Sequence, residues 1–243
     1  MEDQRTATLT ELLTSGFEGE VRTDRSSRLM YATDASIYRE EPLAIVFPRN
    51  TDDIKRLLAF AAKHRIGIIP RAAGTSLAGQ VVGSGIVADI SRHFGKILEI
   101  NVEERWVRLE PGVVPDELNA ALRSHGLLFG PETSTSSRCN LGGMIGNNGC
   151  GLHSVVYGSV RDHIIGVSAL LHDGSEVVFG ELTADQFSQK CTLQTAEGEI
   201  YREIEQIMTD PGHRESIMAG YPEKTIPRRN TGYSLDDLLC SEP

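Results

Sequence analysis

The sequence has few cysteines, and the four that it has stand far apart. Cys139, Cys150, Cys191 and Cys240 form no Cys-x-x-Cys pair, and no cysteine–histidine group has the spacing of a zinc finger. A disulfide framework and a local zinc or iron–sulfur site are therefore excluded. We expect four free thiols and no metal.

Excess basic charge and long apolar runs are also lacking. The chain carries 24 Lys and Arg against 34 Asp and Glu, a formal net charge of −10, which argues against a broad nucleic-acid or anionic-membrane surface. No apolar run approaches ~18 residues, and Met1–Glu20 is polar and acidic where a secretory signal needs a basic and then an apolar region. We expect a cytoplasmic protein, with peripheral attachment to the inner face of the membrane left open.

One part of the chain is patterned as β-α-β, then a loop, then a further strand. Apolar runs over 43–47, 68–69 and 86–88 predict buried strands. Between the first two, Thr51 is the expected cap of an amphipathic helix that Gly67 ends. The loop before the last strand therefore begins at the carboxyl end of a strand.

The remainder of the chain predicts hairpins and helices. Alternating residues over 97–109 predict a hairpin, and a helix should open at Pro115 and close at Gly126. The Asp-Gly centre of 164–179 predicts a second hairpin. A helix should follow Thr195, whereas 211–243 is polar and has no assignable core.

The first of two glycine-rich segments follows a predicted strand and spans 70–80. Its small residues leave main-chain N–H groups unobstructed, and Thr75 and Ser76 add hydroxyl donors, which is typical of a loop that holds an anion. It is not a nucleoside-triphosphate loop, because Gln80 stands where a lysine is required. The Gly83-x-Gly85-x-x-Ala88 run is not a dinucleotide fingerprint either, because a strand and not a helix follows.

The second glycine-rich segment runs from Gly130 to Gly151 and has almost no side chain able to fill a core. We expect a long loop, which compact domains rarely keep without a function. Two such segments suggest a ligand long enough to contact both, such as a dinucleotide with a central pyrophosphate.

Several segments together resemble a known family, the FAD-linked oxidases of the vanillyl-alcohol oxidase type. The similarity is greatest to the branch of D-2-hydroxyacid dehydrogenases that includes D-lactate and glycolate dehydrogenases. The segments that carry it are Tyr31–Tyr38, Pro48–Asp53, Arg71–Gln80, Asn140–Gly151, Tyr157–Asp162 and His172–Gly174.

The resemblance implies an α+β fold, a two-subdomain FAD-binding domain of the vanillyl-alcohol oxidase type. We predict an N-terminal helical segment over 1–40, a first α/β subdomain over 41–92 and a second α+β subdomain over 93–243. In the family the first glycine-rich loop holds the FAD pyrophosphate and the second segment lies along the ribityl and isoalloxazine side. Carried over residue by residue, the implied cofactor-binding residues are Arg71, Ala72, Ala73, Gly74, Thr75, Ser76, Pro131, Thr133, Ser134, Asn140, Gly142, Gly143, Gly146, Asn148, Gly151, Tyr157, Gly158 and the main chain around Ile165.

The resemblance also implies an activity, oxidation of a D-2-hydroxy acid of the D-lactate or glycolate class by hydride transfer to flavin N5. Some members link FAD to a histidine near the first loop, and because 70–80 has none, noncovalent FAD is implied. We expect the catalytic base, and any iron–sulfur cluster, to lie beyond residue 243. The partners would then be a small 2-hydroxy acid and an electron acceptor.

Two alternatives stay open. One is a flavoenzyme of the same fold that resembles UDP-N-acetylenolpyruvylglucosamine reductase. The other is a nucleotide-binding module without chemistry of its own. The histidines do not decide between them, because they are scattered without a carboxylate at helical spacing; His153 lies nearest to the second segment, two residues after its end.

Overall fold

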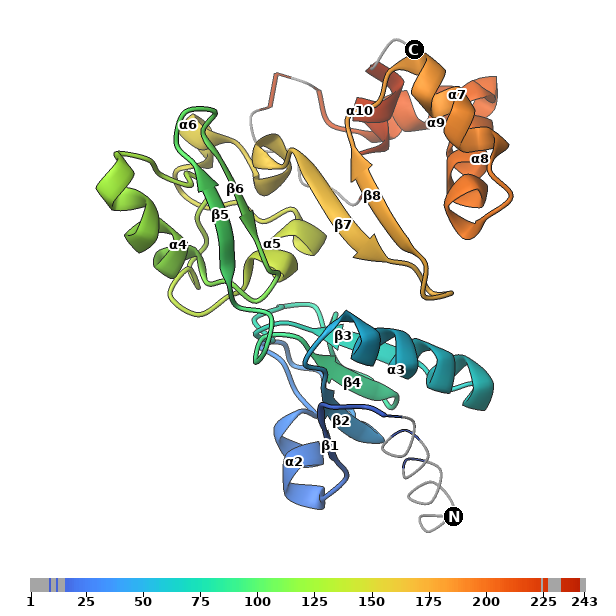
Figure 1. Ribbon diagram of the computed structural model, residues 1–243. Coiled ribbons are helices and arrows are strands. Elements are labelled where there is room, and N and C mark those ends of the chain that lie inside the picture. Colours follow the sequence, from blue (N-terminus) through green and yellow to red (C-terminus); the bar gives the residue numbers. More distant parts are fainter. Residues whose placement is uncertain (1–8, 10–11, 13–15, 224, 227–232, 241–243) are drawn as a thin grey trace.

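The computed structural model describes Leu9, Leu12 and residues 16–223, 225–226 and 233–240, and it has the predicted α+β fold (Figure 1). The N-terminal part is built on a four-stranded sheet in the order β1-β2-β4-β3. The inner strands are parallel, and β1 joins β2 antiparallel. The strands are β1 (Glu20–Arg22), β2 (Ala44–Phe47), β4 (Ile86–Asp89) and β3 (Ile68–Arg71).

Helix α3 (Thr51–His64) covers one face of this sheet. Leu57 and Phe60 of the helix pack there against Val46 and Ile86 of the strands, and all four are buried. Every residue of β2 and β4 is buried, which is why β2 and the first three residues of β4 form continuous apolar runs.

The ends of α3 differ from the prediction. Asn50, and not Thr51, is the cap, because the Asn50 side chain accepts a hydrogen bond from the Asp53 N–H at 2.8 Å. The helix ends at His64, before the expected Gly67, since Arg65 adopts the left-handed conformation at φ 54°. That conformation is usual for glycine, so an arginine gives no signal for it.

The other face of the sheet is covered by helix α2 (Arg25–Met30) and the residues after it. Tyr31 packs there on Phe47, with ring centroids 6.0 Å apart, next to the buried Ile45 and Val87. Strand β1 was not predicted. It brings the N-terminal segment into the sheet, where Val21 lies opposite Val46.

A second core lies against the hairpin over 97–109. Strands β5 (Ile97–Asn101) and β6 (Trp106–Leu109) form the first predicted hairpin, and the helices packed near it are α4 (Pro115–Leu122), η1 (Arg123–His125), α5 (Leu141–Asn147), α6 (Ser154–Tyr157) and η2 (Val160–His163). Gly126 ends η1 at φ 66°, as predicted. The buried residues of this core are Val113, Leu118, Leu122, Cys139, Leu141, Met144 and Val160.

The second hairpin, β7 (Gly166–Leu170) and β8 (Glu176–Gly180), turns at Gly174 with φ 83°, as the Asp-Gly signal predicts. Its tip reaches back to α3 (Figure 1), where Glu176 Oε1 lies 2.6 Å from Lys55 Nζ. The two parts of the chain are therefore in direct contact at this tip.

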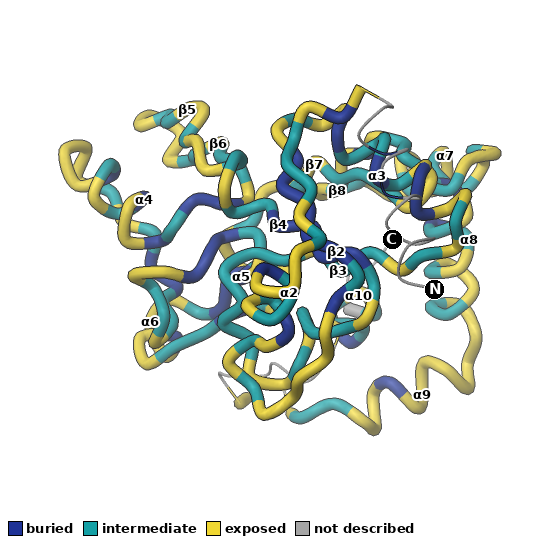
Figure 2. The backbone as a smooth tube through the Cα atoms, turned by 90° about the horizontal axis from the view of Figure 1, so that it is seen from below, coloured by how far each residue is buried: buried dark blue, intermediate teal, exposed yellow. Residues whose placement is uncertain are grey.

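Helices follow the second hairpin: α7 (Ala184–Thr192), α8 (Ala196–Thr209), α9 (Pro211–Gly220) and α10 (Leu235–Cys240). The helix expected after Thr195 is α8, and Thr195 caps it. The remaining three were not predicted. Figure 2 shows α9 as largely exposed, and Ile217 is its one buried residue.

Candidate cofactor site

The loop from β3 to β4 contains two glycines in the left-handed region. Gly74 has φ 66° and Gly79 has φ 78°, conformations that other residues adopt only with strain. A Cβ on Gly79 would lie 2.7 Å from the Tyr38 ring. Glycine is thus required at both positions by the backbone itself.

The first residues of this loop keep their donors free. In the part of the chain that the structure describes, the main-chain N–H groups of Ala72, Ala73, Gly74, Thr75 and Ser76 donate to no other group. These residues are half-buried. Five successive free donors beside two hydroxyls suit the oxygens of a pyrophosphate.

Arg71 does not extend toward such a ligand. Its Nη1 donates to the Thr33 carbonyl oxygen at 2.9 Å, and its Cζ lies 5.0 Å from the centre of the Tyr31 ring. The side chain therefore turns back onto the segment after α2. The resemblance had implied instead that Arg71 binds the cofactor.

The second glycine-rich segment is not the long loop that we expected. Its middle forms α5, and Cys139, Leu141 and Met144 are buried in the second core. Main-chain bonds from Gly142 to the Pro111 carbonyl at 2.8 Å, and from Leu141 to that of Val113 at 2.9 Å, hold its start. These contacts come from another part of the chain and outweigh the low helix propensity of glycine and asparagine.

The start of α5 meets the first loop. A Cβ added at Gly143 would lie 3.3 Å from the Cβ of Ala72, so the two glycine-rich segments are neighbours. Gly146, one turn further along α5, faces open space. The structure thus brings Ala72 of the first segment and Gly143 of the second side by side.

Asn140 precedes α5 and is buried, with 5% of its surface exposed. Its Nδ2 donates to the Gly112 carbonyl oxygen at 2.7 Å. Its Oδ1 has no hydrogen-bond partner among the described residues. A buried acceptor without a partner is costly, and a ligand donor would remove that cost.

Three further predicted residues line a hollow of about 480 Å³. Thr133, Ser134 and Gly151 share it with Cys150 and Leu152, among others. Pro131, two residues before Thr133, is buried. The second segment therefore supplies most of the lining, and Asp116 of α4 and Leu152 supply the rest.

Other glycines of the second segment are explained by sterics. A Cβ on Gly151 would lie 2.3 Å from the Glu132 carbonyl oxygen, and one on Gly130 would lie 2.5 Å from the Tyr157 ring. Gly158 has φ 72°. Tyr157 thus packs against the segment as well as being a candidate lining residue.

The last two predicted residues lie at the edges of the region. Asn148 ends α5 in the left-handed conformation, and its Oδ1 accepts from the Arg161 N–H at 3.1 Å. Ile165 precedes β7 and is 74% exposed. Ile165 makes no hydrogen bond to either glycine-rich segment within the described chain.

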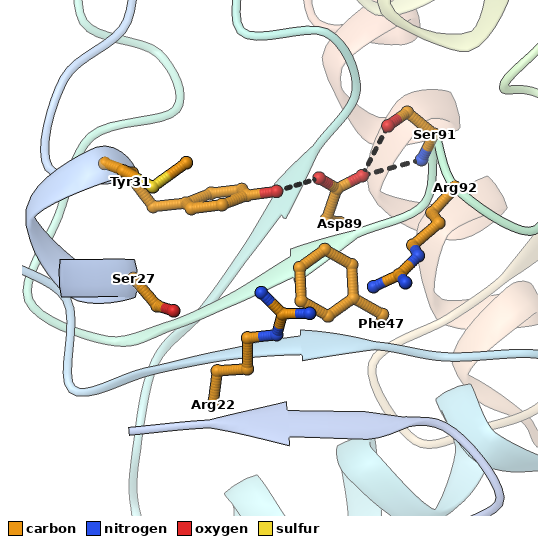
Figure 3. A pocket seen from close by; sticks show the side chains of 8 residues that line it. Arg22, Ser27, Tyr31, Phe47, Asp89, Ser91 and Arg92 are labelled. Carbon is orange, nitrogen blue, oxygen red and sulfur yellow. Dashed lines mark hydrogen bonds between the residues drawn. The ribbon is translucent and has the colours of Figure 1, made fainter. Parts of the chain in front are cut away.

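The analysis of the sequence missed a second hollow, of about 450 Å³, on the sheet face that carries Tyr31 (Figure 3). Arg22 and Arg92 flank the Phe47 ring there, at 5.4 and 5.0 Å from its centre. Both guanidinium groups donate to Glu20 Oε2. These hydrogen bonds, and that of Arg22 most of all, hold the pKa of Glu20 below its usual range. These bonds tie β1 to the segment after β4. Because Arg22 and Arg92 lie far apart in the sequence, no local pattern predicts that their side chains come together.

Metal ligands and membrane spans were searched among the described residues. No group of three or more His, Cys, Asp and Glu there could hold a metal ion, and no helix there has the length and apolar character to cross a membrane. His153 is exposed and its Nδ1 lies 2.8 Å from Glu132 Oε1.

Several known proteins have sequences similar to that of this chain. The chain is 41% identical over 236 residues to the D-2-hydroxyglutarate dehydrogenase of Pseudomonas putida (strain KT2440), covering 95% of this chain and 23% of that protein. It is 31% identical over 204 residues to the glycolate oxidase subunit GlcD of Bacillus subtilis (strain 168), covering 81% of this chain and 43% of that one. The chain therefore spans about a quarter of the first relative's length.

Among solved structures, alkyldihydroxyacetonephosphate synthase has the same fold, with a TM-score of 0.64 and 20% identity over 76% of this chain and 39% of that one. At this identity the likeness concerns the fold alone. A family described as "FAD binding domain" matches residues 42–180. Because this match takes in more than half of the 243 residues, the chain belongs to the FAD binding domain family.

Proposed function

We propose that the chain is the FAD-binding portion of a flavin-dependent dehydrogenase that oxidises a D-2-hydroxy acid. The observation that carries the proposal is the contact between Ala72 and Gly143, because it joins the free donors of the first loop to α5. Family membership supports FAD as the ligand. Bound FAD supplies the hydride acceptor, its flavin N5.

In this proposal the first loop holds the pyrophosphate. The N–H groups of 72–76 and the hydroxyls of Thr75 and Ser76 donate to its oxygens, which are charged and make strong hydrogen bonds. The second segment lines the ribityl and flavin side, and Asn140 Oδ1 is an acceptor available to it. The lining residues proposed are Pro131, Thr133, Ser134, Asn140, Gly142, Gly143, Gly146, Asn148, Gly151, Tyr157 and Gly158, with the main chain around Ile165 at the adenine.

We also propose that the two subdomains are 41–92 and 93–243, after an N-terminal segment 1–40 that lends β1 to the first sheet. FAD would be bound noncovalently, because the first loop has no histidine to carry a covalent link. The activity would belong to a longer protein, since the chain spans 23% of the length of the D-2-hydroxyglutarate dehydrogenase to which it is similar.

The substrate class is a 2-hydroxy acid, which agrees with the names of the relatives. The higher identity to a D-2-hydroxyglutarate dehydrogenase than to a glycolate oxidase subunit makes D-2-hydroxyglutarate the first substrate to test. D-lactate and glycolate, the substrates that the sequence resemblance implies, come next.

FAD binding is tested by fluorescence titration of the 243-residue chain. Weak, saturable binding of added FAD is expected, and acid precipitation should leave the yellow colour in the supernatant. No binding at any FAD concentration would refute the proposal, and colour in the pellet would refute noncovalent attachment.

The reaction is tested in a longer protein that contains these residues. Anaerobic bleaching of the flavin absorbance by D-2-hydroxyglutarate, D-lactate or glycolate is expected, and bleaching by NADPH alone would favour the reductase alternative. If no donor bleaches the flavin, the result would favour the alternative of a nucleotide-binding module without this activity.

A further inference from the structure

Three chain segments converge behind the first glycine-rich loop: the residues after α2, the end of β3 and the end of β4. Arg71 and Asp89 are the last residues of β3 and β4, and they lie opposite each other in the parallel pair. Tyr31 reaches both from the third segment. None of these side chains lies in the row of free donors of the loop.

Asp89 anchors this group. It is 5% exposed, and its Oδ1 accepts from the Ser91 N–H at 2.8 Å and from the Ser91 hydroxyl at 2.7 Å (Figure 3). Its Oδ2 accepts from the Tyr31 hydroxyl at 2.6 Å. The Tyr31 ring is thereby fixed in orientation at its far end.

Arg71 is held by the tyrosine and by the chain that follows it. Its guanidinium lies 5.0 Å from the Tyr31 ring centre, within cation–π distance, and donates to the Thr33 carbonyl oxygen. Loss of the Tyr31 hydroxyl would free the ring to rotate, and the guanidinium would lose a fixed partner.

The same guanidinium lies directly beneath the turn of the loop. A Cβ on Gly74 would stand 2.3 Å from Arg71 Nη2, and Gly74 has φ 66°. The side chain at the start of the loop thus fills the space inside the turn three residues later.

We propose that Tyr31 and Asp89 are positioning residues for Arg71, and that Arg71 supports the Gly74 turn so that the N–H groups of 72–76 are arranged before a ligand binds. The inference rests on the proposed function for its ligand, FAD, and assigns Arg71 a role inside the loop in place of direct contact with phosphate. A preformed loop binds more tightly, because less conformational freedom is lost on binding.

Trypsin tests the ligand-free part of the proposal. Arg71 is the one trypsin site between Arg65 and Arg92, and trypsin must draw this side chain out of its network to cleave the Arg71–Ala72 bond. In Tyr31→Phe, cleavage there should rise about fivefold, as expected for one lost hydrogen bond. Cleavage at Arg56 within α3 reports general unfolding and should rise less than cleavage at Arg71.

Tyr38→Phe is the matched control, because Tyr38 is 56% exposed and its hydroxyl makes no hydrogen bond in the described chain. It should cleave like the wild type. Equal cleavage at Arg71 in Tyr31→Phe and the wild type, or an equal rise at Arg56, would overturn the positioning role whether or not FAD binds.

FAD titration tests the consequence for the ligand. Tyr31→Phe should weaken FAD binding about fivefold, Arg71→Met should weaken it more, and Arg71→Lys should restore part of the loss. Tighter binding in Tyr31→Phe would show instead that freed Arg71 reaches the phosphates, and would overturn the proposal. Failure of the wild type to bind FAD would refute the proposed function and leave the trypsin result standing.

Discussion

Gly143 at the start of α5 lies against Ala72 of the first loop, so close that a Cβ on Gly143 would stand 3.3 Å from the Ala72 Cβ. The two residues are 71 positions apart: Gly143 lies in α5, which packs in the second core, and Ala72 follows β3, whose Ile68 packs against the first. A single ligand that contacts both segments must therefore pass by this junction.

Gly143→Val should weaken FAD binding at least tenfold, because the added methyl groups would push α5 and the first loop apart. Gly220→Ala at the end of α9 is the control, since nothing lies within 4 Å of its added Cβ. Both variants are compared by fluorescence titration and by melting temperature. An unchanged affinity in Gly143→Val would show that the junction does not shape the site.

Asp53 is fully buried, and its two carboxylate oxygens accept from the Glu18 and Arg49 N–H groups at 2.8 and 2.9 Å. Asp53→Ala would leave two donors without partners, at about 1–3 kcal/mol each. Asp52→Ala, one residue earlier and exposed, should cost only a few tenths of a kcal/mol near the helix N-terminus. Urea unfolding measures both, and equal midpoints would contradict the role of Asp53.

Much of the fold is predictable from the sequence where a local pattern decides it. Continuous apolar runs predict β2 and β4 because both strands are buried on both faces, and Asp173-Gly174 predicts the second hairpin because Gly174 adopts φ 83°. Strand β1 is only three residues long and forms because it pairs with β2. No local sequence pattern predicts that pairing.

The candidate site is predictable in residue type and not in arrangement. The small residues and hydroxyls of 72–76 indicate an anion-binding loop, but α5 forms through hydrogen bonds to residues 111–113 and against the helix propensity of its glycines. The direction of Arg71 depends on Tyr31 and Thr33, which lie about 40 positions away. Contacts between residues this far apart cannot be predicted from a local stretch of the sequence.

The Tyr31 hydroxyl should make the protein less stable at alkaline pH. Burial first of all, and then the hydrogen bond to Asp89, raise the pKa of Tyr31 above its ordinary value of 10.0. The folded state then keeps a proton that the unfolded state releases, so this stabilisation is complete below pH ~10 and is lost as the pH rises above that value.

Urea midpoints at pH 8 and 10.5 measure this effect. The wild type should lose more stability over that interval than Tyr31→Phe, which has no phenol to titrate. Tyr201, whose pKa burial also raises, is present in both proteins and cancels in the comparison. A larger loss in Tyr31→Phe would contradict the assignment.

The Gly146→Ala substitution should change the thermal stability and the FAD affinity in opposite directions. Gly146 lies within α5, its φ is not positive, and nothing stands within 4 Å of an added Cβ. Alanine there should raise stability by up to about 1 kcal/mol, because glycine costs that much in a helix. We propose that this open surface lies along the flavin side. The same methyl group should then weaken FAD binding about threefold to tenfold, which is a small change in binding free energy. Thermal unfolding without FAD and fluorescence titration with it measure the two effects separately. A variant that melts higher and binds FAD as tightly as the wild type would remove Gly146 from the cofactor site, and the residue would then have no ligand-based reason to be glycine.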